Sequence, residues 1–220
     1  MARVVLFGIG STAQVMHYHL SRESRHCVEA FTVDAEYLRA DRLAGLPVVP
    51  FEDIAGRYPP DDYAMMIAVG YADVNRLRAR RCAEARALGY RLISHVSPTA
   101  TLWAGLELGG NCKVGAGSLL QPFSRVGDDV FIGSGCIVGH HSVIEDHCFL
   151  ASGVVLGGGV TVESHAFLGT GVTIRNKARI GAYGVVGAGA VVLEDTRPHG
   201  VYVARGAEAL DVSSDALSPG

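Results

Sequence analysis

The sequence lacks any apolar run long enough to cross a bilayer. The longest, at residues 64–70, falls far short of the roughly 20 residues that a membrane helix needs. The first residues, Met1-Ala2-Arg3, lead directly into a strand-like segment without the apolar stretch and cleavage site of a signal peptide. We therefore predict a cytoplasmic protein with no membrane partner.

Excess charge of either sign is also missing. The formal net charge is -3 and the sequence pI is about 6.3. Such a chain has no general field that would concentrate it on nucleic acid or on an anionic surface. We predict no nucleic-acid partner.

The cysteines lack the paired spacing of a disulfide framework or a zinc site. Their number is odd, they are dispersed, and no CxxC motif occurs: Cys27, Cys82, Cys112, Cys136 and Cys148. We predict reduced thiols and no metal.

What the sequence does contain is a six-residue repeat. Every sixth residue from Leu102 to Val192 is Leu, Ile or Val, which makes sixteen positions. Glycine follows nine of them, and the residue two before is small or Val in fifteen cases. A period of six fits neither a helix nor a simple strand, but it fits a short strand and a turn repeated.

Three such units form one triangular coil of 18 residues. The aliphatic residue points inward, the small residue fills the space near the axis, and glycine eases the corner backbone. Cys112, Cys136 and Cys148 fall on the small inward position. Coils of this repeat class are usually left-handed, so we expect a left-handed parallel β-helix. Residues 18 apart then lie one above the other at about the 4.8 Å strand spacing.

The first part of the chain has a different pattern. Strands are predicted at residues 4–7, 27–33 and 63–69, and helices at residues 11–21 and 74–88. This alternation indicates a small parallel α/β layer of the Rossmann-like type. We expect three parts: a Rossmann-like α/β domain at 1–95, a β-helix domain at 96–206, and a polar tail at 207–220.

A glycine-rich turn joins the first strand to the first helix. Amide hydrogens at such a turn, together with the helix N-terminus, can bind phosphate. An acidic residue at the end of the next strand can accept hydrogen bonds from a ribose or base. The half-sized α/β unit fits a sugar nucleotide better than NAD. The predicted substrate-binding residues are Gly8, Gly10, Ser11, Thr12, Asp34 and Gly70.

These features together resemble the bacterial sialic acid O-acetyltransferase and nucleotide-amino-sugar N-acetyltransferase family (NeuD/PglD-like). The resemblance covers residues 3 to about 208. It implies acetyl-CoA as acyl donor, a nucleotide-linked amino sugar as acceptor, and a homotrimer with acetyl-CoA in the cleft between β-helices. It also implies that His140 is the general base and that the Gly158 amide meets the thioester carbonyl. Since 158 is 140 plus 18, the stacking rule agrees.

The chain departs from this family next to the base. Many members have an acidic residue there, where this chain has His141. We therefore keep His141, Glu145 and Asp146 as candidate active-site residues. Three alternatives for orienting His140 stay open: Glu145, Asp146 or a neighbouring subunit.

Two further patterns have structural interpretations. Asp129, His147, His165 and Tyr183 stack at intervals of 18, which favours a ladder at the trimer interface over a ligand site. Four arginines surround one turn of the helix predicted at 74–88, which favours a solvated face over a phosphate patch: Arg76, Arg78, Arg80 and Arg81.

The sequence thus predicts an acetyl-CoA-dependent N-acetyltransferase. Three alternatives stay open: a sugar or sialic acid O-acetyltransferase, a metal protein like the γ-class carbonic anhydrases, and a non-catalytic trimer that binds nucleotide sugars.

Overall fold

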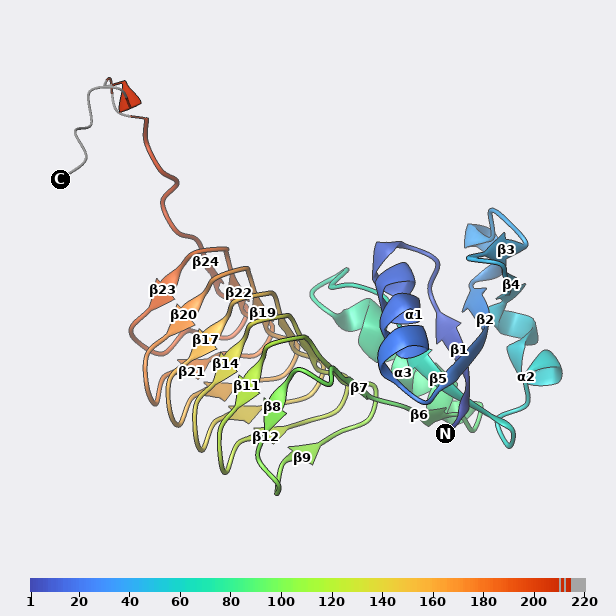
Figure 1. Cartoon of the computed structure of the whole chain (residues 1–220). Helices are drawn as coiled ribbons and strands as arrows, with labels where there is room; N and C mark the ends of the chain where they lie inside the picture. The colour runs from blue at the N-terminus through green and yellow to red at the C-terminus, as the bar shows by residue number, and fades with distance from the viewer. Residues whose placement is uncertain (210, 212, 215–220) are drawn as a thin grey trace.

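The structure, a computed structural model, describes residues 1–209, 211, 213 and 214. An α/β unit precedes a β-helix, and the two pack against each other (Figure 1). The tail predicted at 207–220 falls mostly outside the described residues. Among these residues, the helices are too short or too polar to span a bilayer.

A six-stranded sheet forms the centre of the α/β unit, in the order β3-β4-β2-β1-β5-β6. Its strands are β1 (Arg3–Phe7), β2 (Cys27–Val33), β3 (Arg42–Leu43), β4 (Leu46–Pro50), β5 (Tyr63–Ile67) and β6 (Arg91–Leu92). All neighbours are parallel except β3 and β4. The helices are α1 (Ser11–Glu23), α2 (Ile54–Arg57) and α3 (Arg76–Ala87), with 3-10 turns at Ala35–Tyr37 and Phe51–Asp53.

Strand β1 is buried on both faces, as a central parallel strand should be. Val4 and Leu6 pack in the apolar cluster that contains residues of α1, whereas Val5 and Phe7 pack in the cluster that contains residues of α3. The prediction missed the hairpin of β3 and β4. It also began the last helix too early, because residues 73–75 have φ angles of 51°, 46° and 65°, in the left-handed region.

The β-helix has three faces of two-residue parallel strands. The first face contains β7 (His95–Val96), β10 (Lys113–Val114), β13 (Phe131–Ile132), β16 (Phe149–Leu150), β19 (Phe167–Leu168), β22 (Val185–Val186) and β24 (Val201–Tyr202). The second contains β8 (Thr101–Leu102), β11 (Leu119–Leu120), β14 (Ile137–Val138), β17 (Val155–Leu156), β20 (Thr173–Ile174) and β23 (Val191–Val192). The third contains β9 (Glu107–Leu108), β12 (Arg125–Val126), β15 (Val143–Ile144), β18 (Thr161–Val162) and β21 (Arg179–Ile180).

The 18-residue coil is present as the period predicts. Lys113 pairs with Phe131, and Phe131 with Phe149, each a step of 18 residues. The inward aliphatic residues from Val114 to Val192 are at most 7% exposed, and the cysteines at the small inward position are fully buried. None of the chain's five cysteines forms a disulfide. The parallel strands and the hexapeptide period fit a left-handed β-helix.

The glycine that follows an inward aliphatic residue has a different purpose from the one predicted. A Cβ atom on Gly139 would lie 2.5 Å from the carbonyl carbon of Gly157, so glycine lets successive coils approach closely. The left-handed backbone comes two residues later at the corner, where His141 has a φ of 58°.

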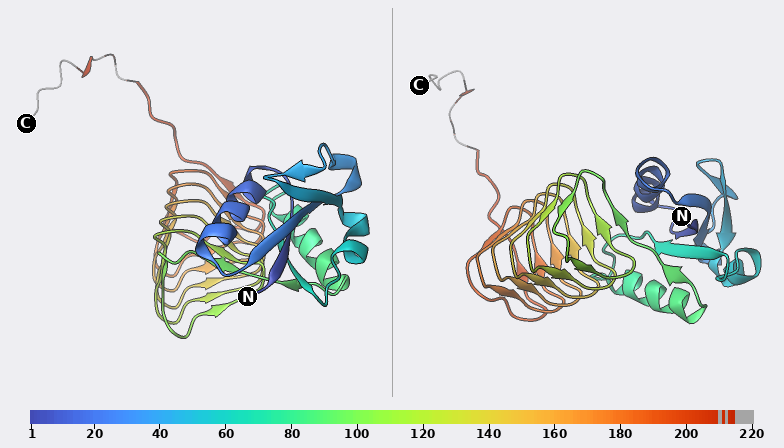
Figure 2. Two further views of the ribbon diagram at one scale, coloured as in Figure 1. Left: turned by 45° about the vertical axis from the view of Figure 1, so that its right-hand side comes forward. Right: turned by 60° about the horizontal axis from the view of Figure 1, so that its bottom comes forward.

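The first face of the β-helix packs against the α/β unit (Figure 2). Phe131 and Phe149 belong to the same apolar cluster as Leu6 and Met16. Tyr71, after β5, contacts the rings of Phe149 and Phe167 with centroids 5.2 and 4.5 Å apart.

Candidate active site

The histidine pair forms the corner between β14 and β15, and both side chains are exposed. The Nδ1 atoms of His140 and His141 lie 3.0 Å apart, and their rings are nearly perpendicular at 87°. One Nδ1 must donate a hydrogen and the other must accept it. When His140 donates, its Nε2 is the unprotonated nitrogen and can take up a proton.

Gly158 lies against the ring of His140, where the 18-residue step places it. A Cβ atom at Gly158 would be 2.6 Å from both Cε1 and Nε2 of His140, so only glycine fits without a shift. The next amide, of Gly159, donates to the His140 carbonyl at 2.7 Å. The Gly158 amide donates to no acceptor among the described residues. An unused amide donor therefore lies beside an imidazole.

Glu145 and Asp146 have partners elsewhere. A carboxylate oxygen of Glu145 accepts from the Ser164 amide at 3.0 Å, and one of Asp146 accepts from the Asp128 amide at 2.7 Å. Within the described residues neither contacts His140. The polar side chain that holds the His140 ring is His141.

The α/β unit contains a cavity of about 410 Å³ that all six predicted substrate-binding residues line: Gly8, Gly10, Ser11, Thr12, Asp34 and Gly70. Gly8 has a φ of 117°, and a Cβ there would lie 2.9 Å from the Ala68 carbonyl oxygen. The chain thus turns tightly into α1, whose first two residues line the cavity. Sequence reasoning missed the contributions of Tyr37 and Leu77, and it assigned Arg80 and Arg81 to solvent.

Asp34 is not a free acceptor in this cavity. Arg81 donates to its carboxylate at 2.5 Å and also to Glu84 at 2.5 Å. Burial raises the pKa of Asp34, and the charge of Arg81 opposes that shift. A ligand in this cavity would therefore meet an ion pair and not a free carboxylate.

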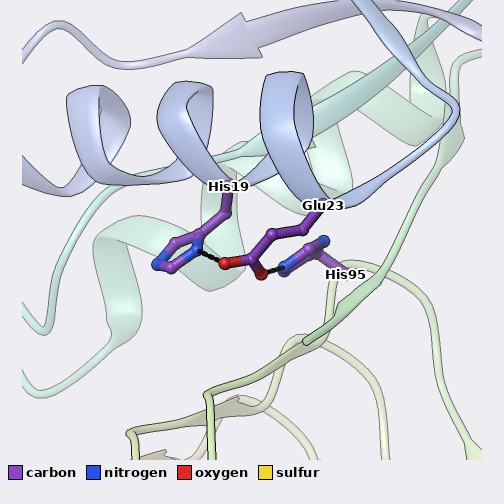
Figure 3. A group of neighbouring side chains, drawn as sticks. All are labelled: His19, Glu23 and His95. Carbon is purple, nitrogen blue, oxygen red and sulfur yellow. Dashed lines mark hydrogen bonds and ion pairs between the residues drawn. The ribbon is translucent and has the colours of Figure 1, made fainter. Parts of the chain in front are cut away.

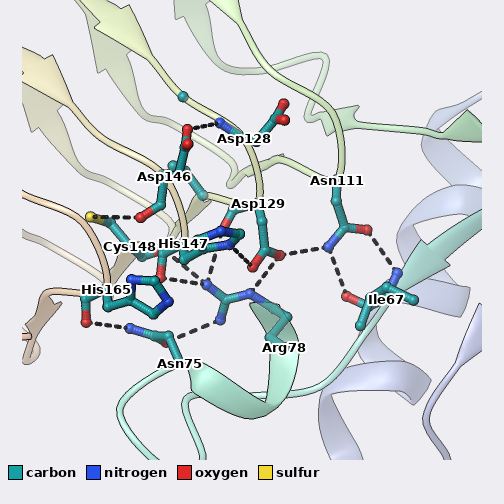
Figure 4. A network of polar contacts seen from close by, with 12 residues as sticks. Ile67, Asn75, Arg78, Asn111, Asp128, Asp129, Asp146, His147, Cys148 and His165 are labelled. Atoms are coloured by element: carbon teal, nitrogen blue, oxygen red, sulfur yellow. Dashed lines mark hydrogen bonds and ion pairs between the residues drawn. The ribbon is translucent and has the colours of Figure 1, made fainter. Parts of the chain in front are cut away.

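The prediction of a solvated arginine face is wrong for Arg78, which is fully buried (Figure 4). Its Nε donates to the Asp129 carboxylate at 2.8 Å. Its Nη2 donates to the backbone carbonyls of Asp129, His147 and Cys148 at 2.9 to 3.1 Å. Arg78 thus joins α3 to the β-helix.

The stacked column exists, but it faces α3 of the same chain. His147 bonds to Asp129 at 2.9 Å, and the rings of His165 and Tyr183 stack with centroids 4.4 Å apart. Arg76 covers Tyr183. The column therefore packs against α3 of its own chain, a contact that the sequence prediction did not include.

The histidine pair and the cavity lie on different sides of the chain. The α/β unit covers the first face of the β-helix, whereas the pair lies where the second face meets the third. Exposed apolar side chains lie on the outer surface of the second face, with Ile137 at 39% and Val191 at 64% exposure.

Known proteins share both parts. Residues 123–158 match the family model of the bacterial transferase hexapeptide (six repeats). Perosamine N-acetyltransferase from Caulobacter crescentus, in a structure with CoA and GDP-perosamine, is 30% identical over 93% of this chain and 94% of its own, with a TM-score of 0.84. No curated protein sequence matches significantly.

Two further structures share the fold. The acetyltransferase domain of PglB from Neisseria gonorrhoeae is 24% identical, with 96% of this chain and 100% of its own covered and a TM-score of 0.81. WeeI from Acinetobacter baumannii is 22% identical, with 93% and 97% covered and a TM-score of 0.71.

The hexapeptide match and the similarity over both units identify an acyltransferase of the hexapeptide-repeat class. The chain belongs to the sugar acetyltransferases of the hexapeptide-repeat family. This membership confirms the resemblance seen in the sequence, and the carbonic-anhydrase-like alternative is set aside.

Proposed function

We propose that the protein transfers the acetyl group of acetyl-CoA to the amine of a nucleotide-linked amino sugar, with His140 as general base. The observation that carries this proposal is the contact of the His140 ring with Gly158, whose amide is unused. The similarity to an enzyme whose structure holds CoA and GDP-perosamine supports both substrates.

The reaction needs a general base and a hydrogen-bond donor close to each other. As the sugar nitrogen bonds to the thioester carbon, Nε2 of His140 takes the proton that the nitrogen loses. The carbonyl oxygen gains negative charge, which the Gly158 amide stabilises. The carbon–sulfur bond then breaks, and the proton on His140 can pass to the departing thiolate.

His141 orients the base. Its Nδ1 accepts the hydrogen on Nδ1 of His140, which leaves the opposite nitrogen of His140 free for the acceptor amine. In this proposal the imidazole takes over the role of the acidic neighbour in related sequences.

The cavity holds the nucleotide in a Rossmann-like manner. Backbone amides at the start of α1, together with Arg80 and Arg81, would bind phosphate, while the ion pair of Asp34 contacts the sugar or base. Residues 1–95 then bind the acceptor and residues 96–206 carry out the transfer, while the tail at 207–220 has no assigned role. A cytoplasmic location stays a prediction from the sequence.

A homotrimer completes the site. The cavity and His140 lie on different sides of one chain, so the cavity of one subunit would act together with His140 of the next. The exposed apolar residues of the second face supply a surface for threefold association.

The test is thiol release from acetyl-CoA with UDP-, GDP- and dTDP-linked 4-amino sugars and with sialic acid. His140→Ala should lower kcat by about 100-fold or more. His199→Ala is the matched control, since it removes another exposed corner histidine of the same β-helix. Reaction with hydroxyl acceptors alone would overturn the N-acetyltransferase assignment, and an active His140→Ala would overturn the base.

A further inference from the structure

A cluster of two histidines and a glutamate lies where the two units meet (Figure 3). His19 and Glu23 are four residues apart on α1 and share one side of that helix. His95 comes from β7, the first strand of the β-helix. The cluster therefore joins α1 to the first coil.

The ligand atoms converge. Nδ1 of His19 lies 2.9 Å from one carboxylate oxygen of Glu23, and Nε2 of His95 lies 3.2 Å from the other. All three ligand atoms lie within 4.8 Å of one another, and no other group of three such residues in the described part of the chain meets that limit. Ligand atoms about 2.0 to 2.1 Å from a tetrahedral zinc are roughly 3.3 Å from one another, which is close to the two nitrogen–oxygen distances.

We propose that His19, Glu23 and His95 bind a divalent transition metal ion, zinc in particular. Two imidazole nitrogens and one carboxylate form a donor set that suits zinc, and a water molecule would complete the tetrahedron. The His95 side chain is only 2% exposed, while those of His19 and Glu23 are 20% and 22% exposed, which leaves a path for the ion.

The site is structural. Its ligands belong to both units, so a bound ion would hold α1 against β7. The acetyl transfer proposed above passes through no metal. Lys113 pairs with His95 in the next coil, and its positive charge attracts the Glu23 carboxylate. That charge would compete with a bound cation. Removing that charge should strengthen metal binding.

The sequence prediction of no metal could not include this site. Residues 19 and 95 are 76 positions apart (95 − 19), so no local spacing marks them as ligands. Only the packing of α1 on the start of the β-helix brings them together.

The experiment is zinc titration of chelator-treated full-length protein by calorimetry, followed by cobalt titration monitored by visible absorption. We expect one ion per chain with a Kd below about 1 μM, and a Tm rise of roughly 5 to 10 °C when free zinc is about 100 times Kd. His19→Ala and Glu23→Gln should each weaken binding by at least about 10-fold. Lys113→Met should strengthen it.

Two controls separate this site from other histidines. His17→Ala removes a partly buried histidine of the same helix and should bind zinc like the wild type. A His140→Ala/His141→Ala double variant should also retain the tight site. A Kd weaker than about 100 μM, or binding that survives His19→Ala and disappears in the double variant, would overturn the proposal.

Discussion

At the scale of single residues, the corner of the β-helix determines what His141 can do. Its left-handed backbone, with a φ of 58°, directs the ring between His140 and Phe123. The ring centroid of Phe123 lies 4.8 Å from that of His141. The ring centroid of Trp103 lies 5.5 Å from that of Phe123. An aromatic row thus supports His141, the residue proposed to orient His140.

The role of His141 can be tested by substitution. His141→Ala removes the acceptor for Nδ1 of His140, so kcat should fall by about 10- to 100-fold with little change in KM. His141→Asn keeps an acceptor oxygen and tolerates the left-handed backbone, so it should retain most activity. Steady-state kinetics measure kcat and KM of both variants. A kcat equal to that of the wild type in both would contradict an orienting role of His141.

His165 gives a second prediction at this scale. Burial lowers the pKa of His165 to about 4, helped by the charge of His147, and its Nδ1 has no hydrogen-bond partner in the described structure. The unfolded chain then binds a proton that the folded chain does not between about pH 6.5 and 4, so acidification should lower stability in that window.

His165→Phe should remove that part of the acid sensitivity. Phenylalanine keeps the stack, and Phe123 shows that a phenylalanine can adopt the left-handed corner, with a φ of 66°. Urea unfolding at pH 7.5 and pH 5 measures the effect. An equal loss of stability on acidification in variant and wild type would contradict the assignment.

At the scale of elements, α3 is attached to the β-helix by one buried ion pair. Arg78 and Asp129 are both fully buried, and Asn111 donates to the same carboxylate at 2.7 Å while its side chain also bonds the backbone of Ile67. Burial would raise the pKa of Asp129, but the His147 hydrogen bond and the Arg78 charge keep it below its ordinary value. The carboxylate therefore stays charged.

Removing Arg78 should destabilise the protein, because the buried Asp129 carboxylate then loses its charged partner. Arg78→Met should lower the free energy of unfolding by about 3–5 kcal/mol. An Arg78→Met/Asp129→Asn double variant should regain part of the lost stability, because it also lacks the negative charge of Asp129. Urea unfolding gives the free energy of unfolding of the wild type, of Arg78→Met and of the double variant. A double variant no more stable than Arg78→Met would contradict this explanation.

At the scale of the whole molecule, the sequence predicted what depends on regular repetition. The period of six identified the β-helix, and the step of 18 brought Gly158 to His140. It did not predict the burial of Arg78, because a helical pattern of arginines says nothing about a second unit packed on that helix. Nor did it predict the partner of His140, since that contact depends on the rotation of one ring at one corner.

In the proposed trimer, the cavity of one chain supplies the amino sugar to His140 of another. The measurement is the activity of trimers purified after coexpression of His140→Ala and Gly10→Glu chains. A Cβ at Gly10 meets no atom within 4 Å, and the new carboxylate would repel phosphate at the start of α1. Each variant alone should be nearly inactive.

With random mixing in equal amounts, about one site in four combines an intact cavity with an intact His140 from the neighbour. The mixed trimers should therefore have about a quarter of wild-type activity. Activity no higher than that of the separate variants would contradict it, since a site contained within one chain cannot be restored by mixing.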